Sequence, residues 1–336
     1  MDAGRLTELI EGSDLDGLIR FVDALCSARD WDGLDQLVER CREAVHRGKQ
    51  VFAAAEFAEY RIALEAPPAH AGPVVSEAGG RYGLGPLWEV AASTHTWADL
   101  EPHLAPGPAR AMVAHERVMR GEDLSDVVVD LVLELPLVLQ PWEPSYPTAT
   151  YRSDKVDSPQ SDLTPLGAVD AAEAGEEVDD IAGTDALRQL VLPWVDQSNG
   201  ASVEVAVAGS ALGAAAAIEE VSGWVAMPAQ EALSYMAWTG ASGGAHGRRR
   251  GSPVGRYDAW WVVAQLGGLD GLDDPSAVGE ALERLSWNRW APAKLAPGWH
   301  CHLAVEDAAA GRAWALAATD FVDDGATTLG SQGSAE

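Results

Sequence analysis

The feature that most constrains the fold is a short internal repeat near the N-terminus. DLDGLIRFVD at residues 14–23 is followed sixteen residues later by DWDGLDQLVE at 30–39. Each copy begins with an aspartate suited to cap a helix N-terminus, and apolar residues follow at spacings of three and four. The apolar positions are Leu18, Phe21, Val22 and Leu25, then Leu34, Leu37, Val38 and Cys41. These two stripes predict helices that pack as an αα-hairpin.

More helices are expected in the first 120 residues, over 51–65, 86–93 and 108–120, and Thr96–Asp99 resembles a capping box. The N-terminal part is therefore predicted to be all-α. A solenoid normally needs three or more repeats, and this repeat is clear twice. A HEAT-like helical repeat and an irregular helical bundle both remain open.

The rest of the chain mixes strand and helix patterns. We predict a strand or short buried helix at 127–136, a strand at 203–207, and a helix or strand at 211–221. Helices are predicted over 228–239, 253–266 and 275–285, a strand over 287–290, and a β-hairpin from 299–306 and 312–319. The predicted fold class is α+β, with an all-α N-terminal domain and a C-terminal α+β domain whose small sheet is largely antiparallel.

Composition suggests where the domains end. Residues 121–247 contain 3 Lys and Arg against 21 Asp and Glu, and much of 141–184 is polar and rich in Pro, Ser and Asp. We predict a helical domain at 1–125, an acidic linker or surface excursion at 126–190, an α+β domain at 191–325 and a disordered tail at 326–336.

The charge restricts the partners. The formal net charge is −29, which would repel nucleic acid, so we expect no nucleic-acid partner. The acidity provides solubility or attracts a basic partner. We also expect no membrane partner, because no apolar stretch is long enough to span a bilayer. The start of the chain lacks signal-peptide features, and three cysteines without a CxxC pair fit a reducing compartment, so the expected location is the cytoplasm.

The leading candidate site is SGGAHGRRRGSPVGR at residues 242–256, with four arginines and five glycines. Guanidinium groups bind carboxylate and phosphate in a bidentate manner, and glycines let backbone N–H groups approach an anion closely. The spacing matches neither a Walker A loop nor a dinucleotide-binding loop. The candidate ligand-binding residues are Ser242, Gly243, Gly244, Arg248, Arg249, Arg250 and Arg256. The alternative is that these arginines pair with internal carboxylates and hold the acidic segment against the second domain.

Catalytic and metal-binding patterns are sparse. His246 is the candidate acid or base near the arginines. His300 and His302 would project from one face of a strand and are the candidate metal ligands, with His246 as a conceivable third. Ser210 lacks the G-x-S-x-G context of a nucleophile elbow. We expect no bound cofactor, and we expect the thirteen tryptophans to fill the core, with an exposed aromatic platform as the alternative.

Three segments, SGGAHGRRRGSPVGRYDAWW, WDGLDQLVERCREAV and EFAEYRIALEAP, resemble a family of actinobacterial proteins of unknown function and similar length. The low lysine content (Lys49, Lys155 and Lys294) is consistent with a high-GC genome. The resemblance implies a cytoplasmic two-part protein and carries no catalytic residue with it.

Two functional hypotheses follow, beside a third, a metal-binding protein through His300 and His302. The first is a non-enzymatic binding or scaffold protein, with a helical interaction surface and an Arg/Gly-loop site for an anionic small molecule or a protein partner. The second is an enzyme acting on a phosphorylated or carboxylated small molecule, in which the arginines clamp the anion and His246 transfers a proton. The sequence leaves the question of enzymatic activity open.

Overall fold

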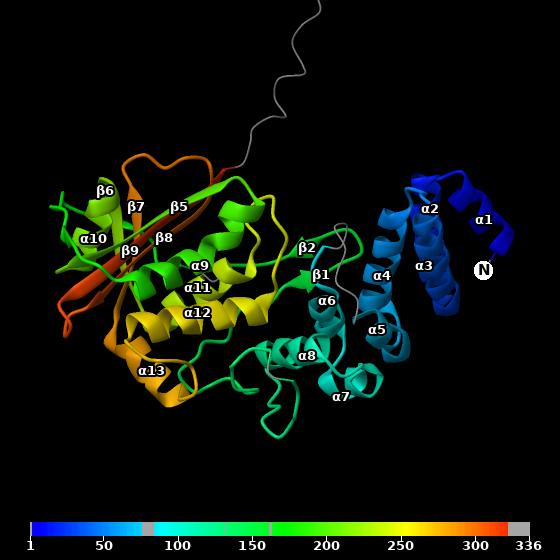
Figure 1. Ribbon diagram of the computed structural model, residues 1–336, viewed down its shortest axis with the longest axis horizontal. Helices are drawn as coiled ribbons and strands as arrows, with labels where there is room; N and C mark the ends of the chain where they lie inside the picture. The colour runs from blue at the N-terminus through cyan, green and yellow to red at the C-terminus, as the bar shows by residue number, and fades with distance from the viewer. Residues whose placement is uncertain (1, 76–83, 131, 161–162, 322–336) are drawn as a thin grey trace, which may run out of the picture. The chain divides into compact units, whose positions relative to one another are not determined.

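The computed structural model describes residues 2–75, 84–130, 132–160 and 163–321, and its backbone contacts divide the chain into two units (Figure 1). Unit 1 comprises the described residues of 1–161 together with 249–257. Unit 2 comprises those of 162–248 and 258–336. Each unit is therefore built from two separate stretches of chain.

Unit 1 is mainly helical. Its elements are α1 Ala3–Glu11, α2 Leu15–Ala28, α3 Trp31–His46, α4 Phe52–Glu65, α5 Pro68–Val75, α6 Leu87–Thr94, α7 Trp97–Leu100, the 3₁₀ helix η1 Glu101–His103, α8 Pro108–Met119, and the short strands β1 Thr150–Tyr151 and β2 Val156–Asp157. α12, Ser252–Leu266, begins in this unit and continues in unit 2.

The internal repeat forms the predicted pair of helices. The Asp14 carboxylate accepts the Gly17 N–H at 2.9 Å at the start of α2, and Asp30 accepts the Gly33 N–H at 3.0 Å at the start of α3. The apolar stripes of both helices pack with α1 and α4 around one core. A second core joins the far end of α4 to α6 and α8, and the capping box at Thr96 is confirmed.

The strand or buried helix predicted at 127–136 is wrong. Its described residues form irregular backbone and bends, with Val128 86% exposed and Leu133 and Leu135 buried. The segment does not form a strand because a backbone carbonyl in it accepts a hydrogen bond from a side chain and not from a neighbouring strand. The Arg256 guanidinium donates to the Pro136 carbonyl at 3.0 Å, so side-chain donors replace a ladder partner there.

Unit 2 contains a seven-stranded sheet in which all neighbours are antiparallel, in the order β3-β6-β7-β8-β9-β5-β4. The strands are β3 Gly167–Ala168, β4 Glu176–Glu177, β5 Gly200–Ala208, β6 Val221–Met227, β7 Ser286–Pro292, β8 Gly298–Asp307 and β9 Arg312–Phe321. The predicted hairpin is confirmed as β8 and β9, with Val305 opposite Trp314. The mixed α+β class is likewise confirmed.

Helices cover both faces of this sheet. The helices of unit 2 are α9 Ile181–Gln197, α10 Ala211–Ile218, α11 Ala229–Ala241 and α13 Pro275–Arg284, together with most of α12. α10 packs with Ala313 and Ala315 of β9, whereas Trp314, on the opposite face, donates its indole N–H to Asp180 at the start of α9. The pattern at 211–221 therefore resolves into a helix followed by the start of β6.

The range 126–190, predicted as a linker or surface excursion, contains β1 to β4 and the first half of α9. β3 and β4 are two-residue edge strands, too short to give a periodic signal in the sequence. The tail predicted at 326–336 lies outside the described residues.

The tryptophans of unit 2 occupy both kinds of position. Trp194, Trp260 and Trp290 are buried, as expected for core residues. Trp299 is 36% exposed and stacks on Trp238 with ring centroids 5.3 Å apart.

Candidate functional site

In unit 2, the glycine-rich stretch after α11 wraps around a buried carboxylate. Asp320 accepts hydrogen bonds from the backbone N–H of Ala245, from the Ser198 hydroxyl at 2.7 Å and from the Asn199 N–H at 3.1 Å. The His246 N–H donates to the Ser198 hydroxyl oxygen at 3.0 Å. The Ala245 N–H of the loop thus binds an anion that is an internal side chain.

Two glycines are required by this packing. Gly244 has φ +80°, and a Cβ there would lie 2.3 Å from the Asp320 carboxylate. A Cβ on Gly243 would lie 1.9 Å from the Arg248 carbonyl oxygen. Ser242 is buried beside them, where its hydroxyl accepts the Trp194 indole N–H at 2.9 Å. Ser242, Gly243 and Gly244 therefore hold the shape of the loop.

In unit 1, Arg249 is bound on all sides by partners. Its Nε and Nη2 donate to the two Glu89 oxygens at 2.9 and 2.7 Å, a bidentate pair. Its Nη1 donates to the Ser158 hydroxyl at 2.7 Å, and Nη2 also donates to the Ser252 hydroxyl at 3.0 Å. The Glu89 carboxylate is fully buried and also accepts the Tyr151 hydroxyl at 2.6 Å.

A second buried glutamate lies in the same electrostatic environment. Burial alone would raise the pKa of Glu89, but the charge and hydrogen bonds of Arg249 lower it below its usual range. For Glu116, burial and then the negative charge of Glu89 raise the pKa to about 8, although Arg120 donates to its Oε1 at 2.8 Å. The Oε2 of Glu116 is buried and has no hydrogen-bond partner. Such opposed carboxyl pKa values are typical of functional sites, although structural ion-pair networks produce them too.

Arg256 makes a second buried pair in unit 1. Its guanidinium is 1% exposed and donates to the Glu143 oxygens at 2.8 and 2.7 Å. Further donors contact the carbonyls of Pro136 and Val138 at 3.0 and 3.1 Å. Burial, followed by the positive charge of Arg256, lowers the pKa of His115 to about 4.

The remaining candidates of the segment 242–256, Arg248, Arg250 and His246, differ in their exposure. Arg248 is exposed, Arg250 is half-buried, and the exposed His246 places Nε2 3.2 Å from the Phe321 carbonyl. Arg248 and His246 both belong to unit 2, on the loop whose backbone Asp320 fixes. The four predicted arginines therefore do not share one environment.

The two candidate metal ligands lie together on β8. The rings of His300 and His302 stack 5.6 Å apart, and His302 is also packed on Trp290. Burial, and then the neighbouring His300, lower the pKa of His302 to about 4, and burial lowers the pKa of His300. Among the described residues, the group of three or more potential metal ligands within coordinating distance lies elsewhere, on α3 and α5. His246 therefore does not complete a three-ligand group with these histidines.

Sequence reasoning missed the carboxylates that bind the arginines. Glu89 interrupts the apolar segment LWEVAA, which is a usable signal for a buried acid, whereas Glu143 lies in PWEPSY, where the sequence gives no such signal. The partner could not be found in this way, because Arg249 is 160 positions from Glu89. Asp320 follows the alternating pattern of β9 onto its buried face, and nothing in the sequence links it to Ala245.

These observations define an α+β protein in which one segment, 242–256, supplies cations and backbone donors to buried carboxylates. The chain belongs to the family described as "Family of unknown function (DUF6183)", whose model matches residues 16–321. No curated protein and no solved structure matches the chain. Within the described ranges, no helix has both the length and the apolar character needed to cross a membrane.

Proposed function

We propose that this is a non-enzymatic binding or scaffold protein of the cytoplasm, whose loop around Arg248 binds a carboxylate or phosphate on a small molecule or a protein partner. The observation that carries the proposal is the exposed Arg248 guanidinium on a loop backbone held by the buried Asp320. A fixed backbone reduces the entropy lost when an exposed side chain binds. The exposed His246, two residues away, offers a second donor.

In this proposal Ser242, Gly243 and Gly244 shape the loop, and Arg249 and Arg256 support the segment through Glu89 and Glu143. The helices of unit 1 supply the surface for a protein partner. The actinobacterial origin suggested by the resemblance stays a prediction.

The enzyme hypothesis receives less support. If all four arginines clamped a substrate, Arg249 and Arg256 would have to leave buried carboxylates with which they form bidentate pairs. Removing one partner from a buried pair costs roughly 3–5 kcal/mol. The binding free energy of a small anion would have to offset this loss for both pairs. A site centred on Arg248 breaks neither pair and is therefore favoured.

Thermal unfolding in the presence of anions tests the proposal. We expect phosphate, citrate or a nucleotide at millimolar concentration to raise the Tm of the wild-type protein. Arg248→Ala should abolish this rise. Arg20→Ala, at an exposed arginine of α2, should retain it.

An equal rise in wild type and Arg248→Ala would show that the anion binds elsewhere. The absence of a rise with every anion would leave the scaffold role without its small-molecule site. Arg249→Ala is unsuitable as the primary test, because it would also strip Glu89 of its counter-charge.

A further inference from the structure

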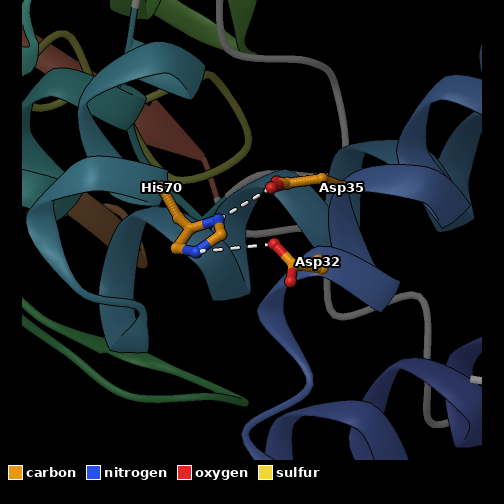
Figure 2. Close-up of side chains that lie close together, drawn as sticks. All are labelled: Asp32, Asp35 and His70. Atoms are coloured by element: carbon orange, nitrogen blue, oxygen red, sulfur yellow. Dashed lines mark hydrogen bonds and ion pairs between the residues drawn. The ribbon is translucent and has the colours of Figure 1, made fainter.

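Two aspartates and a histidine come together in unit 1 (Figure 2). Asp32 and Asp35 lie on α3, and His70 lies on α5 with its ring directed between the two carboxylates. His70 Nδ1 is 2.7 Å from Asp35 Oδ2, and Nε2 is 4.0 Å from Asp32 Oδ1. One potential ligand atom from each of the three residues lies within 4.8 Å of the others.

The internal repeat shows that this cluster is specific to one place in the helical unit. Asp32 and Asp35 are three residues apart on α3, so their side chains share one side of the helix. In the first copy of the repeat, the position of Asp32 is taken by Asp16, but that of Asp35 is taken by Ile19. The second carboxylate is thus present only in the copy that faces His70.

The residue types favour a particular class of ligand. Imidazole with carboxylate suits Zn²⁺ and the neighbouring first-row transition ions, whereas Ca²⁺ and Mg²⁺ prefer oxygen ligands alone. Two carboxylates also leave the cluster negative whenever the imidazole is neutral, and a divalent cation would neutralise both charges.

The present geometry needs a small adjustment to hold one ion. Ligand atoms bound about 2.0–2.2 Å from one metal lie roughly 3 Å apart, close to the observed separation of His70 Nδ1 and Asp35 Oδ2. Asp32 faces the other ring nitrogen, so its carboxylate must swing toward Nδ1. Its side chain is 88% exposed, which leaves room for this rotation.

We propose that Asp32, Asp35 and His70 bind one divalent first-row transition ion, with Zn²⁺ as the representative. His70 supplies Nδ1, each aspartate supplies one oxygen, and water completes the coordination on the exposed side. The ion links the first turns of α3 to the first turn of α5 and so stabilises the helical unit.

Zinc titration of the full-length protein by isothermal calorimetry tests this site. We expect one Zn²⁺ per chain, with an affinity at least about tenfold weaker in Asp35→Asn and in His70→Gln. Asp32→Asn should also weaken binding, and this highly exposed position carries little risk to folding. Asp16→Asn is the matched control, since Asp16 holds the equivalent position in the first repeat, and it should bind Zn²⁺ like the wild type.

Two outcomes would overturn the proposal. One is the absence of Zn²⁺ binding to the wild-type chain, which would leave the cluster as an ion pair between Asp35 and His70. The other is unchanged binding in His70→Gln together with its loss in His300→Gln, which would place the ion on β8. Thermal unfolding without metal should show that the variants are folded.

Discussion

At the scale of single residues, the distribution of donors decides which buried glutamate is ionised. Arg249 directs its guanidinium to Glu89, which keeps that carboxylate charged. Glu116 receives a hydrogen bond from Arg120 at one oxygen, while the other has no partner. Burial and the charge on Glu89 then favour the protonated form of Glu116.

Glu116 should make stability depend on pH above neutrality. Its pKa is raised from 4.5 to about 8, so the folded protein holds this proton more tightly than the unfolded chain. The stabilisation is complete below pH 4.5 and is lost as the pH rises through 8. Between pH 7 and 9 the free energy of unfolding should fall by about 1 kcal/mol on this account, and Glu116→Gln should remove that fall.

Urea unfolding at pH 7 and pH 9 measures the effect as the difference in this fall between the wild type and Glu116→Gln. Burial raises the pKa of Cys26, Cys41 and Cys301 to about 11, so these thiols lower the stability of both proteins over the same range. Both pH values lie above the pKa of His115 and His302, which is about 4. Glu39→Gln, at an exposed glutamate of α3, is the control and should behave like the wild type. The same fall with pH in Glu116→Gln would contradict the assignment.

At the scale of elements, local signals predicted structure wherever they were strong. The aspartate caps of α2 and α3 and the alternation in β8 and β9 gave elements that the structure confirms. The segment 127–136 has the composition of a strand but bonds to the Arg256 side chain. In the candidate site, too, the local features could be predicted and the long-range contacts could not. Its chemistry was visible in the glycines and arginines, but their carboxylate partners lie too far away in sequence to predict.

The close approach of the Gly244 backbone to the Asp320 carboxylate can be tested by substitution. Gly244→Ala should destabilise unit 2 by roughly 1–3 kcal/mol, because φ is +80° and the new Cβ would collide with the Asp320 carboxylate. Gly268→Ala is matched in conformation, with φ +72° and open space around its Cβ, and should cost less. Chemical denaturation measures the free energy of unfolding of both variants. Since both carry the strain of a positive φ, the difference between their losses reports the collision with Asp320. Equal losses would show that the loop moves aside at little cost.

At the scale of the whole molecule, the acid excess dominates the electrostatics. A net charge of −29 implies mutual repulsion among surface carboxylates, which opposes the compact state. Salt screens exposed charges, whereas buried pairs such as Arg249–Glu89 and Arg256–Glu143 are screened much less. Added salt should therefore weaken the repulsion between surface carboxylates without breaking the buried ion pairs of unit 1.

Accordingly, we expect the Tm to rise as NaCl is increased from about 0.05 M to about 0.5 M, a range over which the Debye length shortens severalfold. Calorimetry or circular dichroism measures this. The rise should persist in Arg248→Ala, which separates general screening from chloride binding at the loop. A lower Tm at high salt would mean that exposed ion pairs outweigh the repulsion.

The division of unit 1 into two stretches of chain has a consequence for biosynthesis. Residues 1–161 leave the ribosome well before 249–257, and until then Glu89 and Glu143 lack the cations that neutralise them. At about 5–20 residues per second, this interval lasts on the order of 5–20 s. The N-terminal helices therefore emerge first, but two buried carboxylates of unit 1 stay without their arginine partners until most of the protein has been made. A fragment ending at residue 161 would carry that unfinished state permanently.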